Sequence, residues 1–209
     1  MTAEPVAAAT VQPTARLGGK PARKRYDADS LLDVAVRVFT ERGFDGTSME
    51  QLAQAAGITK SSIYHHVAGK DELLGRSLNR ALDGLFGVLA AAPDGRAIDR
   101  LESVVRGSVR VLVEEQPHVT LLLRVRGNTP VEKAALARRR DFDRAVTELV
   151  EQAEADGDLR DDADSALSAR LVFGMVNSIT EWHRPGRGLG VERLADAVVQ
   201  LALDGLRPR

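Results

Sequence analysis

The chain has 209 residues, of which 44% are hydrophobic and 28% charged, the composition of an ordinary globular protein with a buried core. Cysteine is absent, which excludes disulfides, thiolate metal sites and cysteine nucleophiles. The net charge of −1 is unevenly divided: residues 1–80 carry 11 basic and 9 acidic side chains, a balance of +2, and the rest carries −3. No long apolar run and no signal-peptide pattern is present, so we expect a soluble, cytoplasmic protein without a membrane partner.

The first 25 residues differ from the rest of the chain in composition. They are rich in alanine, proline and threonine and show no hydrophobic periodicity, so we expect a disordered arm over residues 1–25. Against the single acidic residue Glu4, the arm carries five basic residues: Arg16, Lys20, Arg23, Lys24 and Arg25. This local basic charge suits contact with nucleic-acid phosphates, and it equally suits a solvated tail.

From Asp29 onwards, apolar residues recur at helical spacing. Strand-type alternation is missing, so the predicted fold class is all-α. The expected helices, in chain order, cover about 29–42, 49–56, a short segment starting at 59, then 70–89, 97–115, 117–125, 130–156, 162–183 and 190–206.

Capping residues mark several of these helix starts. Thr47 and Glu50 have the spacing of a capping box before the second helix, and Thr59 is a suitable N-cap for the third. Thr129 and Glu132 form the same pattern before a helix that begins with Pro130.

The segment Met49–Val67 has the pattern of a helix-turn-helix. Ala53 provides the small residue at which two helices can cross, and Gly57 tolerates the positive φ of the turn. The apolar positions that hold the pair together are Leu52, Ala56, Ile58 and Ile63. The opposite face of the second helix carries polar or flat side chains suited to base edges and phosphates in the major groove, namely Lys60, Ser61, Tyr64 and His65.

The stretch Arg25–Leu74 resembles the DNA-binding domain of the TetR family of bacterial repressors. The match rests on the segments 35–39, 43–48, 52–58, 63–66 and 70–74. Val67 and Ala68 depart from the family pattern, which usually has a phenylalanine followed by a polar residue. The resemblance implies an N-terminal three-helix DNA-binding domain over 26–72 and a helical effector-binding and dimerisation domain over 73–209. It also implies a repressor of transcription that binds a double-stranded operator.

The resemblance further implies which residues contact DNA: Thr47, Ser48, Thr59, Lys60, Ser61, Ser62, Tyr64, His65 and Lys70. A lysine at a helix N-terminus opposes the helix dipole, so Lys70 suggests a nearby phosphate; the alternative is a solvated lysine offset by Asp71 and Glu72. Adjacent histidines on a helix diverge by about 100°, so His65 and His66 do not suggest a shared metal ion.

The last two helices are expected to form a homodimer interface, because one short recognition helix reads too few bases for useful specificity. Two apolar stripes support this expectation, although such stripes also occur inside a single protomer. Their residues are Leu167, Leu171, Met175 and Ile179 in one, and Leu194, Val198, Leu201 and Leu206 in the other.

A small-molecule effector is expected inside the C-terminal helices. Segments 124–130 and 175–185 are similar to those of the acyl-CoA-responsive branch of the family, so an acyl-CoA thioester is the first candidate. An apolar drug-like ligand of an efflux-pump repressor is the alternative. The candidate ligand residues, which also read as plain core, are Phe86, Leu89, Val109, Leu112, Leu122, Arg124, Phe142, Val146, Phe173, Val176 and Trp182. Arg138–Arg140 could bind the ligand or form a solvated face.

Other protein classes find little support in the sequence. Gly-x-Ser-x-Gly and His-Glu-x-x-His motifs are missing, and the glycine-rich segment 184–190 follows no strand, so it does not suit a phosphate loop. Four histidines without cysteine do not favour a zinc site. We therefore expect no enzyme, metal or cofactor, with a helical enzyme or a helical scaffold that does not bind DNA as the alternative class.

Overall fold

A computed structural model describes residues 28–184, 186 and 188–208, so the arm predicted for residues 1–25 lies outside the described residues. The predicted all-α class is confirmed: this part of the chain folds into nine helices without a strand. They are α1 Ala28–Arg42, α2 Met49–Ala56, α3 Lys60–Tyr64, α4 Lys70–Ala90, α5 Ala97–Glu114, α6 Gln116–Arg124, α7 Pro130–Ala155, α8 Ser165–Trp182 and α9 Val191–Leu206.

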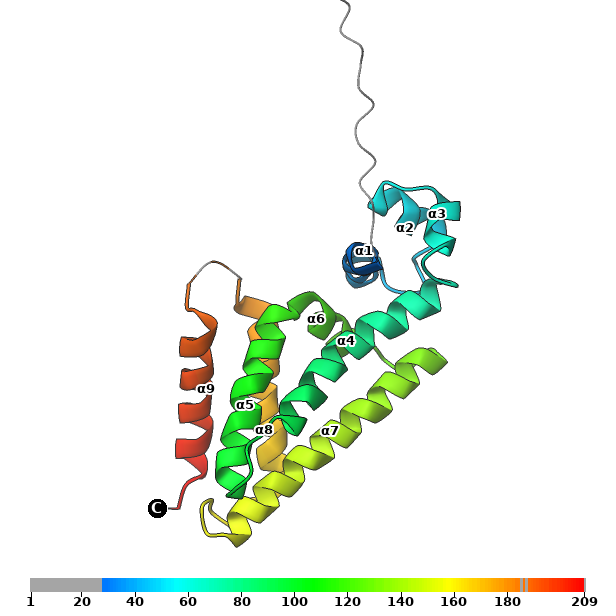
Figure 1. Cartoon of the computed structure of the whole chain (residues 1–209). Helices are drawn as coiled ribbons and strands as arrows, with labels where there is room; N and C mark the ends of the chain where they lie inside the picture. The colour runs from blue at the N-terminus through cyan, green and yellow to red at the C-terminus, as the bar shows by residue number, and fades with distance from the viewer. Residues whose placement is uncertain (1–27, 185, 187, 209) are drawn as a thin grey trace, which may run out of the picture.

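The helices form two groups joined by the long helix α4. Helices α1 to α3 cluster at one end of the molecule, and α4 runs from them into the larger group (Figure 1). There α5 and α8 lie between α7 on one side and α9 on the other, while α6 bridges towards α1 (Figure 1). Among the described residues, no helix combines the length and hydropathy needed to span a membrane.

Each group has its own set of large buried side chains. In the first group Phe39 of α1, Leu52 of α2 and Ile63 of α3 are almost completely buried, and the Phe39 ring lies 5.4 Å from that of Phe44. In the second group a chain of edge-to-face rings crosses the core. Phe142 of α7 stands at its centre, 6.0 Å from Phe86 of α4 and 5.4 Å from Phe173 of α8. The core therefore fixes α4, α7 and α8 relative to one another.

The first predicted capping box is wrong by one residue. Ser48, not Thr47, is the N-cap of α2: its hydroxyl accepts from the backbone N–H of Gln51 (3.2 Å), and the Gln51 side chain accepts from the backbone N–H of Ser48 (2.8 Å). Thr47 is buried because the turn after Gly43 directs it inwards, and its hydroxyl donates to the Gly43 carbonyl (2.7 Å). The N-cap predicted at Thr59 is confirmed by its bond from the backbone N–H of Ser62 (3.2 Å).

The second predicted box is confirmed only in part. Thr129 caps α7 by accepting from the backbone N–H of Glu132 (3.1 Å), and Pro130 is the first helical residue. The Glu132 carboxylate, however, reaches beyond the N-cap. It accepts from the backbone N–H groups of Arg126, Gly127 and Asn128 at 3.2, 2.8 and 2.8 Å. One buried carboxylate thus holds the loop between α6 and α7.

The start of α8 also differs from the prediction. The helix begins at Ser165 rather than at 162, because Asp164 caps it: the Asp164 carboxylate accepts from the backbone N–H of Leu167 at 2.6 Å.

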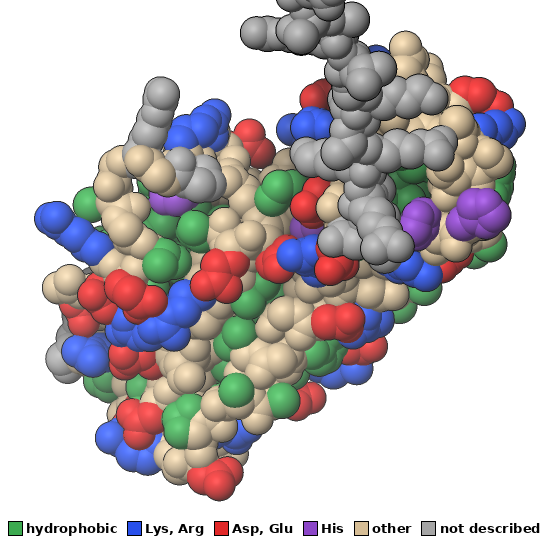
Figure 2. Space-filling view, turned by 45° about the horizontal axis from the view of Figure 1, so that its top comes forward, with side chains coloured by type: hydrophobic (Ala, Val, Ile, Leu, Met, Phe, Trp, Pro, Cys, Tyr) green, Lys and Arg blue, Asp and Glu red, His purple; other side chains and the backbone are tan. Residues whose placement is uncertain are grey.

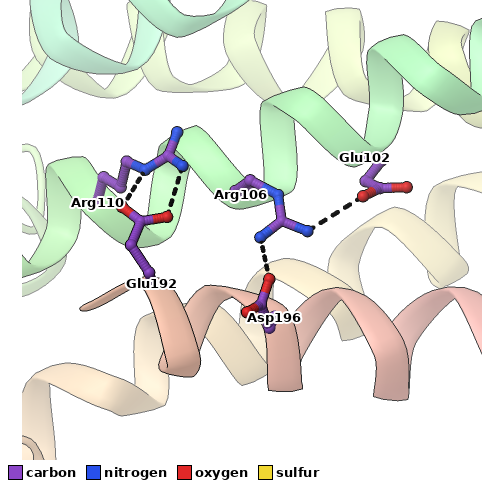
Figure 3. Close-up of polar contacts among 5 residues, drawn as sticks. All are labelled: Glu102, Arg106, Arg110, Glu192 and Asp196. Carbon is purple, nitrogen blue, oxygen red and sulfur yellow. Dashed lines mark hydrogen bonds and ion pairs between the residues drawn. The ribbon is translucent and has the colours of Figure 1, made fainter. Parts of the chain in front are cut away.

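Ion pairs attach α9 to the outer face of α5. Arg110 binds the Glu192 carboxylate through two nitrogens, at 2.8 and 2.6 Å, and Arg106 contacts both Glu102 (3.1 Å) and Asp196 (Figure 3). Acidic and basic side chains accordingly alternate over α5 and α9 on the surface (Figure 2). Because these pairs are solvated, most of the stability of this contact comes from buried apolar residues of α9.

The pair Arg110–Glu192 predicts a dependence of stability on pH. The hydrogen bond from Arg110 lowers the pKa of Glu192 below its ordinary value. A lowered pKa stabilises the folded state above the unfolded-state pKa, near pH 4, and this contribution is lost as pH falls through the folded-state pKa. Glu192→Gln should therefore reduce the free energy of unfolding at pH 7, and this deficit should shrink as the pH is lowered to 3. Urea unfolding at both pH values tests this, with exposed Glu148→Gln as the control. An equal deficit at both pH values would contradict it.

Candidate functional site

The first candidate site is the surface formed by α2, its following turn and α3. Gly57 ends α2 in the left-handed region (φ +67°), and the backbone N–H of Ile58 returns to the Ala53 carbonyl at 3.0 Å. Ala53 is buried, which allows the two helices to approach. Ile63 is fully buried and anchors α3 to the core. The local signals in the sequence therefore produce the angle between α2 and α3 that a helix-turn-helix requires.

With Ile63 turned inwards, the other side of α3 faces solvent. Lys60, Ser61, Tyr64 and His65 are all exposed, and the large Tyr64 side chain is 48% accessible. Histidine side chains gather at this end of the molecule (Figure 2). An aromatic ring is more favourably placed against the edge of a nucleic-acid base than in water, so an exposed ring among short polar side chains indicates a binding surface.

Hydroxyl groups cluster at the start of α3. The Thr59 hydroxyl lies 2.9 Å from that of Ser61 and 2.8 Å from that of Ser62. Ser48, the exposed N-cap of α2, adds a further hydroxyl to this surface. Hydroxyl and backbone N–H groups at helix starts are the usual positioning contacts to phosphate oxygens.

Lys60 forms an ion pair with Glu50 of α2. The hydrogen bond between them raises the pKa of Lys60 and lowers the pKa of Glu50. Both side chains are exposed, so the pair exchanges readily with solvent and leaves the ammonium group available to an anionic partner.

Two of the residues predicted to contact phosphate have structural partners. Thr47 is buried, as described above. Lys70 donates to the carbonyls of Phe44 (3.1 Å) and Thr47 (3.3 Å), and its ammonium lies 4.3 Å from the centre of the Phe44 ring. Lys70 therefore holds the start of α4 against the loop before α2. Its ammonium group has protein partners, unlike that of a lysine that contacts only solvent.

The second candidate site is a cavity of about 350 Å³ between α7 and α8. Its apolar wall includes Val146 and the half-buried Phe173, and its polar wall includes Thr147 and Asn177. Three guanidinium groups line it, from Arg139, Arg144 and Arg170. The arrangement suits a ligand with an apolar part and an anionic group.

A second, smaller cavity of about 30 Å³ adjoins the first on the side of the core. The two cavities share four lining residues: Arg139, Asp143, Phe173 and Asn177. Apart from Ser108, the remaining wall of the inner cavity is apolar and includes Leu112, Leu122, Phe142 and Val176, all of them predicted as ligand residues. Partial desolvation raises the pKa of Asp143, and the nearby Arg139 and Arg170 oppose that rise.

The remaining predicted ligand residues lie outside the lining of both cavities. Phe86 packs on Phe142, and Leu89 and Val109 belong to the surrounding core. Arg124 reaches the first helix group instead, where its guanidinium donates to the Thr40 carbonyl of α1 at 3.1 Å. Trp182, at the end of α8, is 55% exposed.

Sequence reasoning missed several cavity residues, notably Ser108 of α5, Asp143 and Asn177. The run Arg138–Arg140 divides three ways. Arg138 binds Asn79 and Asp83 of α4, both at 2.7 Å; Arg139 lines both cavities; and Arg140 is exposed outside them. These three arginines are consecutive in the sequence. Their different surroundings follow from the orientation of α7 about its own axis, which the sequence alone does not reveal.

Exposed apolar side chains form a surface on α8 and α9. Leu167 and Leu171 of α8 and Leu201 of α9 are 53%, 65% and 69% exposed. The other stripe residues divide: Ile179, Leu194 and Val198 are buried in the protomer, whereas Met175 and Leu206 are half-buried. The exposed part is a candidate protein–protein contact.

The joint between the two helix groups lies where α1 meets α4 and α6. His118 of α6 is 2% exposed, and its Nδ1 lies 3.2 Å from the Ser77 carbonyl of α4. Its Nε2 lies 3.6 Å from Asp33 of α1, and Arg80 of α4 binds Glu115 at 2.7 Å. Polar contacts thus connect α6 directly to the first group.

Comparisons with known proteins agree with this two-part arrangement. Residues 31–76 match the family model described as "Bacterial regulatory proteins, tetR family", and residues 94–206 match "Tetracyclin repressor-like, C-terminal domain". The HTH-type transcriptional repressor KstR2 of Rhodococcus jostii (strain RHA1) is 29% identical over 210 residues, covering 94% of this chain and 97% of the relative.

Two solved structures are similar over most of their length. SCO3833 from Streptomyces coelicolor A3, a member of the TetR transcriptional regulator family, is 56% identical with a TM-score of 0.80, covering 90% of this chain and 94% of its own. AibR, solved in complex with isovaleryl coenzyme A and operator DNA, is 28% identical with a TM-score of 0.69, covering 83% and 96%.

Proposed function

Because this chain belongs to the TetR family of transcriptional regulators, we propose that it is a dimeric repressor released from a palindromic operator by a small-molecule effector, an acyl-CoA thioester. The observation that carries the DNA-binding part is the exposed face of α3, held by the buried Ile63. Ser48, Thr59, Ser61 and Ser62 contact phosphates, while Lys60, Tyr64 and His65 face the bases. Thr47 and Lys70 affect DNA binding indirectly, because they stabilise the loop that positions Ser48.

Dimerisation follows from the exposed apolar surface of α8 and α9. Leu167, Leu171 and Leu201 are large apolar side chains that the protomer leaves exposed, and a two-fold contact would bury the same residues from each copy. Such a dimer presents two α3 helices to two half-sites, which gives the specificity that one five-residue helix lacks.

Effector binding reaches DNA through α6. Leu122 and Leu123 line the inner cavity, and Arg124 at the end of the same helix contacts Thr40 of α1. A ligand that enlarges the inner cavity displaces α6, and the polar joint carries that displacement to α1. The distance between the two α3 helices then no longer fits the operator.

The nature of the cavity favours a thioester over an apolar drug-like ligand. Three arginines and one carboxylate, that of Asp143, line its outer part, whereas a pocket for cationic drugs would be expected to carry an excess of acidic groups. AibR, whose structure contains isovaleryl coenzyme A, is similar over most of its length and adds support. Repression of an efflux pump remains the second candidate, because Phe142, Phe173 and Val176 would also accept an apolar ring.

Fluorescence anisotropy with DNA duplexes from the region that flanks the protein's own coding sequence tests whether the protein is such a regulator. We expect salt-sensitive binding to a palindromic site, and Lys60→Ala should weaken it about tenfold because a direct groove contact is lost. Lys133→Ala, which removes an exposed lysine of α7, is the matched control and should not change affinity. If no duplex showed salt-sensitive binding, the proposal that the protein is a DNA-binding regulator would be refuted.

A further inference from the structure

Ser108 is a buried polar group that the fold leaves without a partner. Its side chain is 1% exposed in the middle of α5, and its hydroxyl makes no hydrogen bond within the described part of the chain. Ser108 lines the inner cavity, whose other walls are mostly apolar. A buried hydroxyl without a partner is unfavourable, so its presence in a cavity wall suggests that a ligand supplies the partner.

Two guanidinium groups near the same cavities have the Asp143 carboxylate as a charged neighbour but make no direct bond to it. Arg139 lines both cavities and Arg170 lines the outer one. Neither forms an ion pair or donates a hydrogen bond to any residue that the structure describes. Arg144, the third arginine of the outer cavity, is held by Asp141 at 3.3 Å. Arg139 and Arg170 are therefore the cations available to an anionic ligand.

We propose that the effector is an anionic amphiphile whose charged group binds Arg139 and Arg170 and whose apolar part enters the inner cavity, where an oxygen atom accepts a hydrogen bond from Ser108. This rests on the effector cavity of the proposed function and specifies its polarity and its contacts. The anionic group can be the phosphates of a coenzyme A thioester or the carboxylate of a fatty acid, and the binding test separates the two.

Phe173 is the one apolar residue among the four that line both cavities. Its ring is half-buried, lines both cavities and packs edge-to-face on Phe142 at 5.4 Å. At about 30 Å³ the inner cavity holds little more than one water molecule, so an apolar chain enters only if Phe173 moves. Ligand entry thus requires a rearrangement of the core beside α6.

Asp143 opposes the binding of an anion. It lines both cavities and lies close enough to Arg139 and Arg170 for their charges to lower its pKa against the effect of desolvation. A ligand anion competes with this carboxylate for the same cations. Asp143→Asn should therefore tighten binding of an anionic ligand, which a purely structural role of Asp143 does not predict.

Isothermal titration calorimetry of the full-length protein with octanoyl coenzyme A, octanoate, coenzyme A and rhodamine 6G tests the proposal. We expect binding of octanoyl coenzyme A or octanoate and no binding of the cationic dye. Arg139→Gln and Arg170→Gln should each weaken binding about tenfold or more. Ser108→Ala should weaken binding about threefold to tenfold without lowering the melting temperature, because the hydroxyl has no partner in the free protein. Exposed Arg140→Gln is the matched control and should match wild type.

Three outcomes would overturn the proposal. One is binding of the dye in place of the anionic probes. Another is binding of an anionic probe that Arg139→Gln and Arg170→Gln leave unchanged. The third is binding of none of the probes while the same preparation still binds its operator, which rejects the ligand assignment but leaves the regulator. Loss of operator binding in wild-type protein would instead reject the proposed function itself.

Discussion

Replacing Glu132 by alanine should lower the free energy of unfolding by about 3 kcal/mol, a large effect for a single side chain. The carboxylate is 5% exposed and accepts three backbone N–H groups of the loop between α6 and α7. Bonds to a charged acceptor are stronger than neutral ones, and their loss leaves buried donors without partners. Urea unfolding followed by circular dichroism measures the difference.

The matched control is Glu148→Ala, which removes the same side chain from an exposed position of α7 and should change stability by no more than about 0.5 kcal/mol. Glu132→Gln keeps one acceptor oxygen without the charge, so its stability should lie between wild type and Glu132→Ala. A Glu132→Ala protein as stable as the control would contradict the prediction. It would mean that water satisfies the N–H groups of the loop as well as the carboxylate does.

The sequence predicted the elements well because local signals decide them. Helix ends follow glycines, prolines and caps. The predicted bounds of α2, which Gly57 ends, agree with the structure, and those of α7, which Pro130 begins, differ by one residue. The face of α3 was also predictable, since one buried residue, Ile63, orients a helix of five residues. Thr47 and Ser48 show the limit of this reasoning: both can cap a helix, and only the turn after Gly43 decides which one faces inwards.

The lining of the cavities could not be predicted in the same way. Ser108 reads as an ordinary small residue of an amphipathic helix, and its importance depends on where α6, α7 and α8 pack against α5. Phe86 and Phe142 were both predicted as ligand residues, but of the two only Phe142 lines the inner cavity. Likewise, the sequence of a leucine stripe does not reveal whether its residues pack within the protomer or against a second copy. Leu194 is buried inside the protomer, whereas Leu201 is exposed.

Leu171→Glu should convert the protein to a monomer and lower operator affinity more than about 100-fold. Leu171 is 65% exposed in the protomer, so the charge costs little in the isolated chain. In the proposed dimer, the two-fold axis places this residue of each copy in the apolar contact, where a carboxylate loses its hydration and meets a like charge. Separated protomers bind their half-sites independently, which removes the gain from linking two weak contacts.

Sedimentation equilibrium and operator anisotropy on the same sample measure the two effects together. Ala134→Glu, which adds the same charge to an exposed position of α7, is the matched control and should remain dimeric with full affinity. Circular dichroism must show unchanged helix content in both variants, because loss of folding would also abolish binding. A Leu171→Glu protein that is folded and still dimeric would place the interface on another face and would remove the structural basis proposed here for pairing the two α3 helices.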